Sequence, residues 1–272
     1  MRSVLITGTS SGIGRATALR LARHDDLAVY ATARSVGSLA DLESAGCHPL
    51  ALDVTDEPSM STVVQMIEEA HGQVDVLVNN AGYGEYGPIE LVDLARVREQ
   101  FETNVFGLSR LTQLVLPGMR RAGRGRIVNV SSMGGRLVFP GGGYYHASKY
   151  AVEAISDALR QEVRPFGIDV AVVEPGLIRT GFGDTARDSM AGRDFAAYAA
   201  MVSSITEAMN RSYASHRLSA PPDVAARAVE RAVTARRPRT RYVVTATAKT
   251  LVHSRRLLGG RAFDAINRLQ FR

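Results

Sequence analysis

Tyr145 and Lys149 are four residues apart in a segment, 144–163, whose apolar spacing predicts a helix. Side chains at this spacing lie on the same face of a helix, one turn apart. A free phenol has a pKa near ~10 and is a poor base at neutral pH. A neighbouring ammonium group would lower that pKa, so Tyr145 would serve as a general acid in one direction and a general base in the other. The pair is common by chance and needs support from the surrounding sequence.

Polar and glycine residues follow two predicted strands at the point where each strand ends. The strand 126–131 runs into two serines, and the strand 74–79 runs into an Asn-Ala-Gly loop. These residues are Ser131, Ser132, Asn80, Ala81 and Gly82. Open α/β sheets build their sites at the carboxyl ends of their strands, so a serine hydroxyl and this loop are expected at one edge of the sheet.

A glycine-rich loop connects the first predicted strand, 3–7, to a predicted helix, 12–23. Glycine permits a tight turn, and the helix N-terminus favours an anion such as a pyrophosphate. The spacing is GxxxGxG, which is a weak signal alone but is strengthened by its strand–loop–helix setting. The residues expected to bind a dinucleotide here are Gly8, Ser10, Ser11, Gly12, Ile13 and Gly14.

The end of the second predicted strand bears on the choice of cofactor. An acid in this position normally holds the adenosine ribose hydroxyls, but here the residue is Ala33, followed by Arg34. A guanidinium group would pair with a 2′-phosphate. The sequence therefore favours NADP(H) over NAD(H), the alternative being that Arg34 is a solvated charge at a strand end.

The predicted strands and helices alternate along the chain. This pattern predicts one doubly wound, Rossmann-type α/β domain over residues 1–272, with about seven parallel strands and helices on both faces. The strands are 3–7, 28–33, one ending with 50–54, 74–79, 126–131, 168–174 and 242–245. The helices are 12–23, 58–70, 94–121 as two successive segments, 144–163 and 221–235. Residues 177–220 contain no strand and are interpreted as a mobile helical lid over a pocket.

Together, these motifs resemble the short-chain dehydrogenase/reductase family over about residues 3–245. The residues that carry the resemblance are the glycine loop, Asn79, Asn80, Ala81, Gly82, Asn104, Ser132, Tyr145, Lys149, Pro175 and Gly176. The resemblance implies that Tyr145 donates or accepts the proton and that Ser132, with Ser131 as second choice, orients the substrate oxygen. Lys149 would bind the nicotinamide ribose and, together with an oxidised nicotinamide, lower the tyrosine pKa. Asn104 would hold a water in a proton relay.

The resemblance also implies the remaining cofactor contacts. Asp53 and Val54 would contact the adenine, and the loop of Asn80, Ala81 and Gly82 would lie against the cofactor. The nicotinamide carboxamide would be held by Pro175, Gly176, Ile178 and Thr180. The lysine spacing selects Tyr145 over Tyr144, and His146 is expected to pack or to line the pocket.

Within the family, segments 82–90 and 239–242 resemble the 17β-hydroxysteroid and retinol dehydrogenase branch. This implies a lipophilic alcohol or ketone such as a steroid, a retinoid or a polyketide-like ketone. The lid offers apolar side chains that would either contact such a substrate or simply pack the lid: Phe182, Met190, Phe195, Tyr198, Met201 and Met209.

The charge of the chain is uneven. The net charge is +6, but residues 236–272 hold ten basic residues and one acid. Residues 246–272 form a basic amphipathic extension that Gly259 and Gly260 interrupt. This extension would pack on the body, cover the pocket or an interface between subunits, or lie on an anionic membrane surface. Nucleic-acid binding is disfavoured because no aromatic platform or reader motif accompanies the charge.

Composition excludes several other classes. The single cysteine, Cys47, and the scattered histidines give no disulfide framework and no metal-ligand spacing, so no metal is expected. Without a signal peptide or an apolar run of membrane-spanning length, a cytoplasmic location is expected. The family resemblance implies a homodimer or homotetramer. The competing functions are a non-catalytic NADP(H)-binding regulator and a sugar-nucleotide epimerase. The epimerases usually need more than the about 95 residues that follow Gly176.

Overall fold

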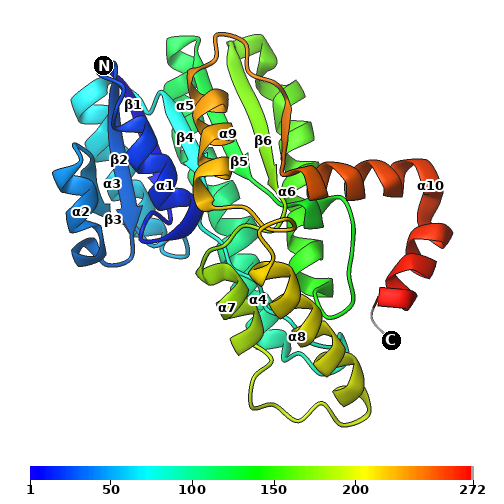
Figure 1. Ribbon diagram of the computed structural model, residues 1–272. Helices are drawn as coiled ribbons and strands as arrows, with labels where there is room; N and C mark the ends of the chain where they lie inside the picture. Colours follow the sequence, from blue (N-terminus) through cyan, green and yellow to red (C-terminus); the bar gives the residue numbers. More distant parts are fainter. Residues whose placement is uncertain (271–272) are drawn as a thin grey trace.

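Seven parallel strands form one sheet at the centre of the protein (Figure 1). The computed structural model describes residues 1–270, apart from the side chains of Ile266, Leu269 and Gln270. The strands are β1 (Arg2–Thr7), β2 (Leu27–Ala33), β3 (His48–Ala51), β4 (Val76–Asn79), β5 (Gly125–Val130), β6 (Ile168–Pro175) and β7 (Arg241–Val244). Their order is β3-β2-β1-β4-β5-β6-β7, so the order reverses between β1 and β4, where doubly wound sheets bind their ligands. The predicted fold class is confirmed.

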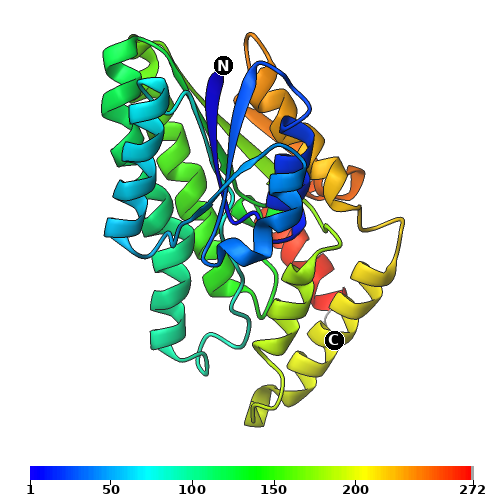
Figure 2. The same ribbon diagram turned by 90° about the vertical axis from the view of Figure 1, so that its left-hand side faces the viewer.

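Helices cover both faces of this sheet (Figures 1 and 2). One face carries α1 (Gly12–Leu21), the short α2 (Ala40–Ser44) and α9 (Pro222–Thr234). The other carries α3 (Glu57–His71), α5 (Leu108–Ala122) and α6 (Gly143–Val163). Successive strand residues supply the two cores in turn: Val4 and Ile6 face the first core, and Leu5 faces the second. Both sets are fully buried, as expected for parallel strands that have helices on both sides.

The long helical segment predicted over 94–121 contains a local change of helix type. It consists of α4 (Leu94–Phe101), one π-helical turn (Glu102–Gly107) and α5. Gly107 lies against the turn that follows β3, because a Cβ atom there would be 2.3 Å from the carbonyl oxygen of Val54. Single π turns inside α-helices occur often at functional sites, and this one carries Asn104.

Several strand boundaries differ from the prediction by one to three residues, and three of them have a local cause. The third strand ends at Ala51 and not at Val54, because Asp53 turns the chain by accepting hydrogen bonds from the backbone and hydroxyl of Thr55. The fourth begins at Val76 and not at Val74, since the Asp75 carboxylate binds the backbone N–H of Ser3. The last ends at Val244, because Thr245 has a φ of 79°. The 3₁₀ turn Val36–Leu39 and α2 were not predicted, as both are too short for a periodic pattern.

The segment 177–220 is helical, as predicted, and contains α7 (Gly181–Asp188) and α8 (Ala199–Ala214). It extends beyond the carboxyl edge of the sheet (Figure 1). Helix α8 packs through Val202 and Ile205 in a small apolar cluster with Met190 and Phe195.

The C-terminal extension forms α10 (Ala246–Gln270), which is kinked at Gly259 with a φ of 75°. It packs on the body through Ala248 and Phe263, in a cluster with Met133 and Leu137. Phe271 and Arg272 and the side chains of Ile266 and Leu269 lie outside the described residues. No helix within residues 1–270 has the length and apolar character that crossing a membrane requires.

The basic tail is not one continuous surface. Arg236, Arg237 and Arg239 precede β7, whereas α10 follows it, so the two basic groups lie at opposite ends of that strand (Figure 1). Arg241 is paired with Glu153, at 3.0 Å, and with the fully buried Glu174, also at 3.0 Å. The positive charge counted in the sequence is therefore divided, and part of it is neutralised within the protein.

Candidate active site

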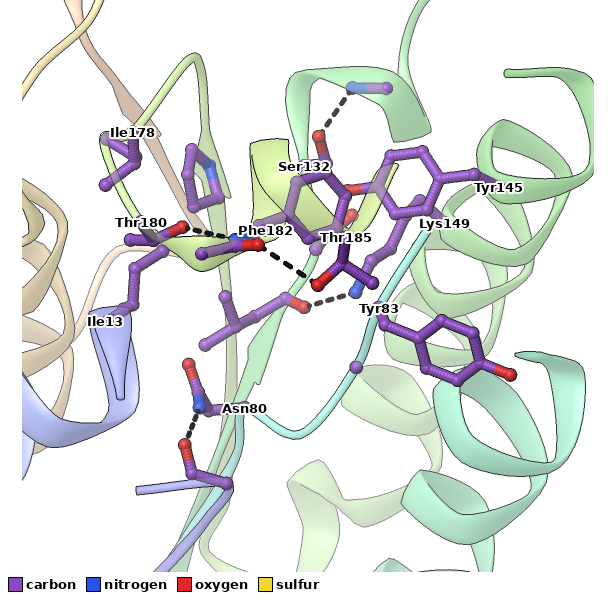
Figure 3. A pocket seen from close by; sticks show the side chains of 18 of the residues that line it. Ile13, Asn80, Tyr83, Ser132, Tyr145, Lys149, Ile178, Thr180, Phe182 and Thr185 are labelled. Carbon is purple, nitrogen blue, oxygen red and sulfur yellow. Dashed lines mark hydrogen bonds between the residues drawn. The ribbon is translucent and has the colours of Figure 1, made fainter. Parts of the chain in front are cut away.

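One cavity of about 1220 Å³ lies at the carboxyl edge of the sheet and contains nearly all of the predicted site residues. It runs from the glycine loop, past β2 and the end of β3, to α6 and the segment 177–220. Figure 3 shows Tyr145, Lys149 and Ser132 on one side and Ile13, Ile178 and Thr180 on the other. Of the predicted residues, Gly14 and Asn104 do not line it and lie directly behind its wall.

Tyr145 projects from the first turn of α6 into this cavity and is only 6% exposed. Burial penalises the phenolate and raises the pKa of Tyr145 to about 12. A hydrogen bond from the Ser132 hydroxyl opposes this shift. In the protein alone, the phenol is therefore held in its neutral form, as a proton donor.

Ser132 is fixed by the turn that it begins. It is the N-cap of the 3₁₀ turn Met133–Gly135, and its hydroxyl oxygen accepts a hydrogen bond from the backbone N–H of Gly134 at 3.0 Å (Figure 3). His146 supports the same turn: its Nε2 accepts from the backbone N–H of Phe139 at 3.2 Å, so its Nδ1–H donates to the carbonyl of Gly134 at 3.1 Å. Burial lowers the pKa of His146 to about 4, so the ring is a neutral packing group, as predicted.

Lys149 lies one turn along α6 from Tyr145, and its side chain crosses to the end of β5. Its Nζ donates to the carbonyl oxygen of Val130 at 3.1 Å. Burial lowers the pKa of Lys149 to about 8, and the nearby carboxylate of Glu153 opposes the shift. Burial thus outweighs any lowering of the Tyr145 pKa by Lys149 in the protein alone.

Asn104 anchors the loop that follows β4. Its amide oxygen accepts from the backbone N–H of Tyr83 at 3.0 Å, and its amide nitrogen donates to the Tyr83 carbonyl at 2.8 Å and to the Ser148 hydroxyl at 3.0 Å. Both amide hydrogens are thereby used. A water in a proton relay would have to be held by another atom of this residue, such as its main-chain carbonyl.

The glycine loop is bound to the loop after β4 by Thr7, a residue that the sequence did not single out. The Thr7 hydroxyl accepts hydrogen bonds from the backbone N–H groups of Asn80 and Ala81, both at 3.0 Å. The Asn80 amide in turn donates to the carbonyl of Gly8 at 3.0 Å. Asn80 therefore shapes the phosphate loop as well as lining the cavity.

The cavity fits a dinucleotide at this end. Helix α1 begins at Gly12 without a side-chain cap and without an acid in its first turn, so its N–H groups remain available for an anion. At the end of β2, Arg34 is exposed and lines the cavity, and none of the described carboxylates pairs with it. Asp53 and Val54 line the same end, as predicted.

Aromatic side chains surround Tyr145 on the side away from the glycine loop. The ring of Tyr86 stacks on that of Tyr145 with centroids 5.7 Å apart, and Phe182 of α7 lies 5.1 Å from it. Tyr213 of α8 lines the cavity as well. The sequence indicated Phe182 among the lid residues, but no pattern in it indicated that Tyr86 and Tyr213 lie close to Tyr145.

A buried carboxylate holds the segment 177–220 against the loop after β4. Glu85 is 3% exposed and pairs with Arg193 of that segment at 3.1 Å and with Arg96 of α4 at 2.9 Å. The backbone N–H of Tyr86 also donates to the Ser189 hydroxyl at 2.9 Å. These contacts keep α7 and α8 over the cavity.

Comparison with known proteins places these features in a wider group. Residues 2–191 match the short chain dehydrogenase family. The uncharacterized oxidoreductase YbbO of Escherichia coli K12 is 36% identical over 97% of this chain and 93% of its own length. The NADPH-dependent 3-dehydrocapnine reductase of Ornithobacterium rhinotracheale is 32% identical over 98% and 96%. Human retinol dehydrogenase 8 is 42% identical over 66% of this chain and 60% of its own length.

Solved structures agree in fold. A short-chain dehydrogenase from Streptomyces avermitilis has a TM-score of 0.82 and 36% identity, covering 98% of both chains. A short chain dehydrogenase/reductase from Burkholderia phymatum, in complex with NAD, has a TM-score of 0.80 and 26% identity over 94% of this chain and 93% of its own.

Proposed function

Since the chain belongs to the short-chain dehydrogenase/reductase family, in its retinol dehydrogenase-like branch, we propose that it is an NADP(H)-dependent oxidoreductase. It would interconvert a secondary alcohol and a ketone, or a primary alcohol and an aldehyde. The main support for the proposal is that one cavity is lined by Tyr145, Ser132, Lys149 and the glycine loop.

The chain's own residues would hold the substrate and move the proton. When bound, the nicotinamide supplies or accepts the hydride. Ser132, held by the N–H of Gly134, would donate a hydrogen bond to the substrate oxygen. Tyr145 would donate its proton to that oxygen during reduction and take it back during oxidation. Lys149 would bind the nicotinamide ribose, and Asn104 would hold the relay water.

The preference for NADP(H) rests on Ala33 and Arg34. No acid at the end of β2 is available for the ribose hydroxyls, and the exposed guanidinium of Arg34 lies at the cavity edge. A relative of similar length is named as NADPH-dependent. A solved neighbour binds NAD, so the choice has to be tested with both cofactors.

The substrate is proposed to be lipophilic. The end of the cavity beyond Tyr145 is lined by Phe139, Phe182, Ile205, Met209 and Leu251. The segment 177–220 would act as a lid over it, since its helices α7 and α8 line that end and Glu85 pairs with Arg193 to hold the segment against the loop after β4. The substrate class proposed from the sequence, a steroid, retinoid or polyketide-like ketone, fits this lining.

The proposal also covers the oligomeric state and the location of the protein. A cytoplasmic homodimer or homotetramer is proposed, and Phe106 and Tyr150, exposed by 55% and 39% near α5 and on α6, offer an apolar contact surface. Helix α10 covers part of the cavity through Thr247 and Leu251. Leu257 of this helix is exposed and has arginines beside it, so a peripheral membrane contact through this helix is also proposed.

The test is oxidation of NADPH and of NADH, followed by absorbance, against steroid, retinoid, quinone and simple ketones. Tyr145→Phe should lower turnover by at least about 100-fold, which is the usual contribution of a positioned general acid. Tyr144→Phe is the matched control, because it removes the neighbouring phenol, whose hydroxyl donates to the carbonyl oxygen of Ile89. Equal turnover by both variants would refute the role of Tyr145. NADPH binding without turnover on any compound would favour the non-catalytic regulator instead.

A further inference from the structure

Two tyrosines besides Tyr145 present phenol groups to the substrate end of the cavity. Tyr86 follows β4, and its ring stacks on that of Tyr145 at 5.7 Å with 29° between the ring planes. Tyr213 comes from α8 and packs against Gly183 of α7, where a Cβ atom would lie 3.1 Å from the Tyr213 ring. Both side chains are half-buried and line the cavity. Three phenols from three different elements thus line the same cavity.

The hydroxyls of Tyr86 and Tyr213 have no hydrogen-bond partner among residues 1–270. Most other tyrosines of the chain differ. The hydroxyls of Tyr30, Tyr144, Tyr198 and Tyr242 bond to His71, Ile89, Glu90 and Arg239, respectively. A phenol in a largely apolar cavity usually finds a partner. The two free hydroxyls are therefore available to a ligand.

Uncharged residues line the substrate end of the main cavity, whereas Tyr213 also borders a smaller pocket together with Arg179, Asp184 and Arg187. The charged residues that line the cavity are all at its cofactor side or on α4, α6 and the π turn: Arg34, Asp53, Glu99, Glu102 and Lys149. Arg187 of α7 lies near Tyr213 but outside the lining, and it is paired with Asp184 and with Asn210, the latter at 2.8 Å. Burial raises the pKa of both Tyr86 and Tyr213, so both remain neutral. None of the described residues lining the substrate end of the main cavity is a cation, so an anionic substrate group there would be desolvated without a charged partner.

A hydroxyl group is the neutral ligand that matches two adjacent phenols. A phenol both donates and accepts a hydrogen bond, and so does an alcohol. One substrate hydroxyl could accept from one tyrosine and donate to the other. An ether or an alkyl group in the same place would leave at least one phenol unpaired.

We propose that Tyr86 and Tyr213 are specificity-determining residues that bind a neutral hydroxyl on the carbon next to the reacting carbonyl. The substrate is then a lipophilic α-hydroxy ketone, and the product of its reduction is a vicinal diol. This inference rests on the proposed oxidoreductase function and narrows its substrate class.

The experiment compares an apolar α-hydroxy ketone with its deoxy analogue, using NADPH and the full chain. The wild type should prefer the hydroxy ketone in kcat/KM. Tyr86→Phe and Tyr213→Phe should each lower that preference by about three- to tenfold, as expected for one neutral hydrogen bond, and should leave kcat/KM for the deoxy ketone nearly unchanged. Tyr198→Phe is the control, because it removes a phenol of the same segment that does not line the cavity.

Binding of the same two ketones to the protein–NADP⁺ complex, measured by calorimetry, separates this inference from the proposed function. A preference for the hydroxy ketone that either variant reduces would support the phenol site even if no ketone were turned over. Equal affinity and equal kcat/KM for the two ketones in the wild type would overturn it. An equal loss for both ketones in the variants would also overturn it, because that result indicates only a displaced segment 177–220.

Discussion

Replacing Gly14 with alanine should damage both folding and cofactor binding. Gly14 lies in the first turn of α1, where it packs against the two loops that line the cofactor end of the cavity. A Cβ atom there would be 2.2 Å from the carbonyl oxygen of Gly8 and 2.4 Å from the amide nitrogen of Asn80. These two atoms are hydrogen-bonded to each other at 3.0 Å, so the added methyl group would push into the bond between the loops.

The cost follows from this geometry. A carbon atom needs about 3.4 Å from such neighbours, so the loops must separate by roughly 1 Å. Overpacking of this kind costs about 1–3 kcal/mol, and an Asn80 amide left without its partner adds about 1–3 kcal/mol. For a chain of this size, each kcal/mol lowers Tm by about 2–4 °C, so Tm should fall by roughly 5–20 °C. Displacement of the backbone N–H groups of the glycine loop should also weaken NADPH binding by about 10-fold or more.

Thermal unfolding and NADPH fluorescence titration measure the two effects. Gly37→Ala is the matched control: Gly37 is exposed, and the nearest atom to its added Cβ would be the Ser35 hydroxyl at 3.8 Å. It should change the unfolding free energy by less than about 0.5 kcal/mol. If Gly14→Ala changed Tm and the NADPH Kd no more than Gly37→Ala does, the close contact of α1 with the two loops would not be a feature of the protein in solution.

Three further predictions concern single side chains. Arg34→Ala should raise the Kd for NADPH by about 10-fold and leave the Kd for NADH unchanged. This is the lower range for a charge-assisted hydrogen bond, because Arg34 is exposed. An equal loss of affinity for both cofactors would contradict a contact with the 2′-phosphate. The folded-state pKa of His146, about 4, lies below the unfolded value of ~6.5, so unfolding takes up a proton as the pH falls between them. Stability should then drop by up to about 2–3 kcal/mol from pH ~7 to ~4.5, and urea midpoints of His146→Gln should lose that part of the pH dependence. Cys47 is 4% exposed with a pKa raised to about 11 by burial, so its thiol should resist Ellman's reagent in the folded protein and react fully in denaturant.

The sequence predicted the sheet and most of the site because both depend on local patterns. Alternating apolar strands and helices specify a parallel sheet, and motifs at strand ends meet at one edge because the strands are parallel. Tyr145, Ser132 and the glycine loop therefore come together as expected. The boundary errors occurred where a single side chain decides the turn, as Asp53 does by binding Thr55.

Contacts between distant segments could not be predicted in this way. Tyr86 and Tyr213 line one cavity because the segment 177–220 packs against the loop after β4, and no periodicity encodes that packing. The pairing of Glu85 with Arg193, 108 residues away, is of the same kind. Asn104 was predicted from its motif, but the π turn that aims its amide at Tyr83 was not.

The electrostatics of the site also depend on burial, which the sequence does not give. The sequence predicts that Lys149 and an oxidised nicotinamide together lower the Tyr145 pKa. In the protein without cofactor, burial raises the pKa of the tyrosine to about 12 and lowers that of the lysine to about 8. Both shifts disfavour a charged pair, so the protein by itself holds a neutral phenol beside an amine that is close to losing its proton. A neutral phenol is the form that donates a proton to a carbonyl oxygen. Oxidation of an alcohol instead needs the phenolate, and thus additional positive charge beside Tyr145. In the proposed function, a positively charged oxidised nicotinamide would supply the charge that the oxidation direction needs.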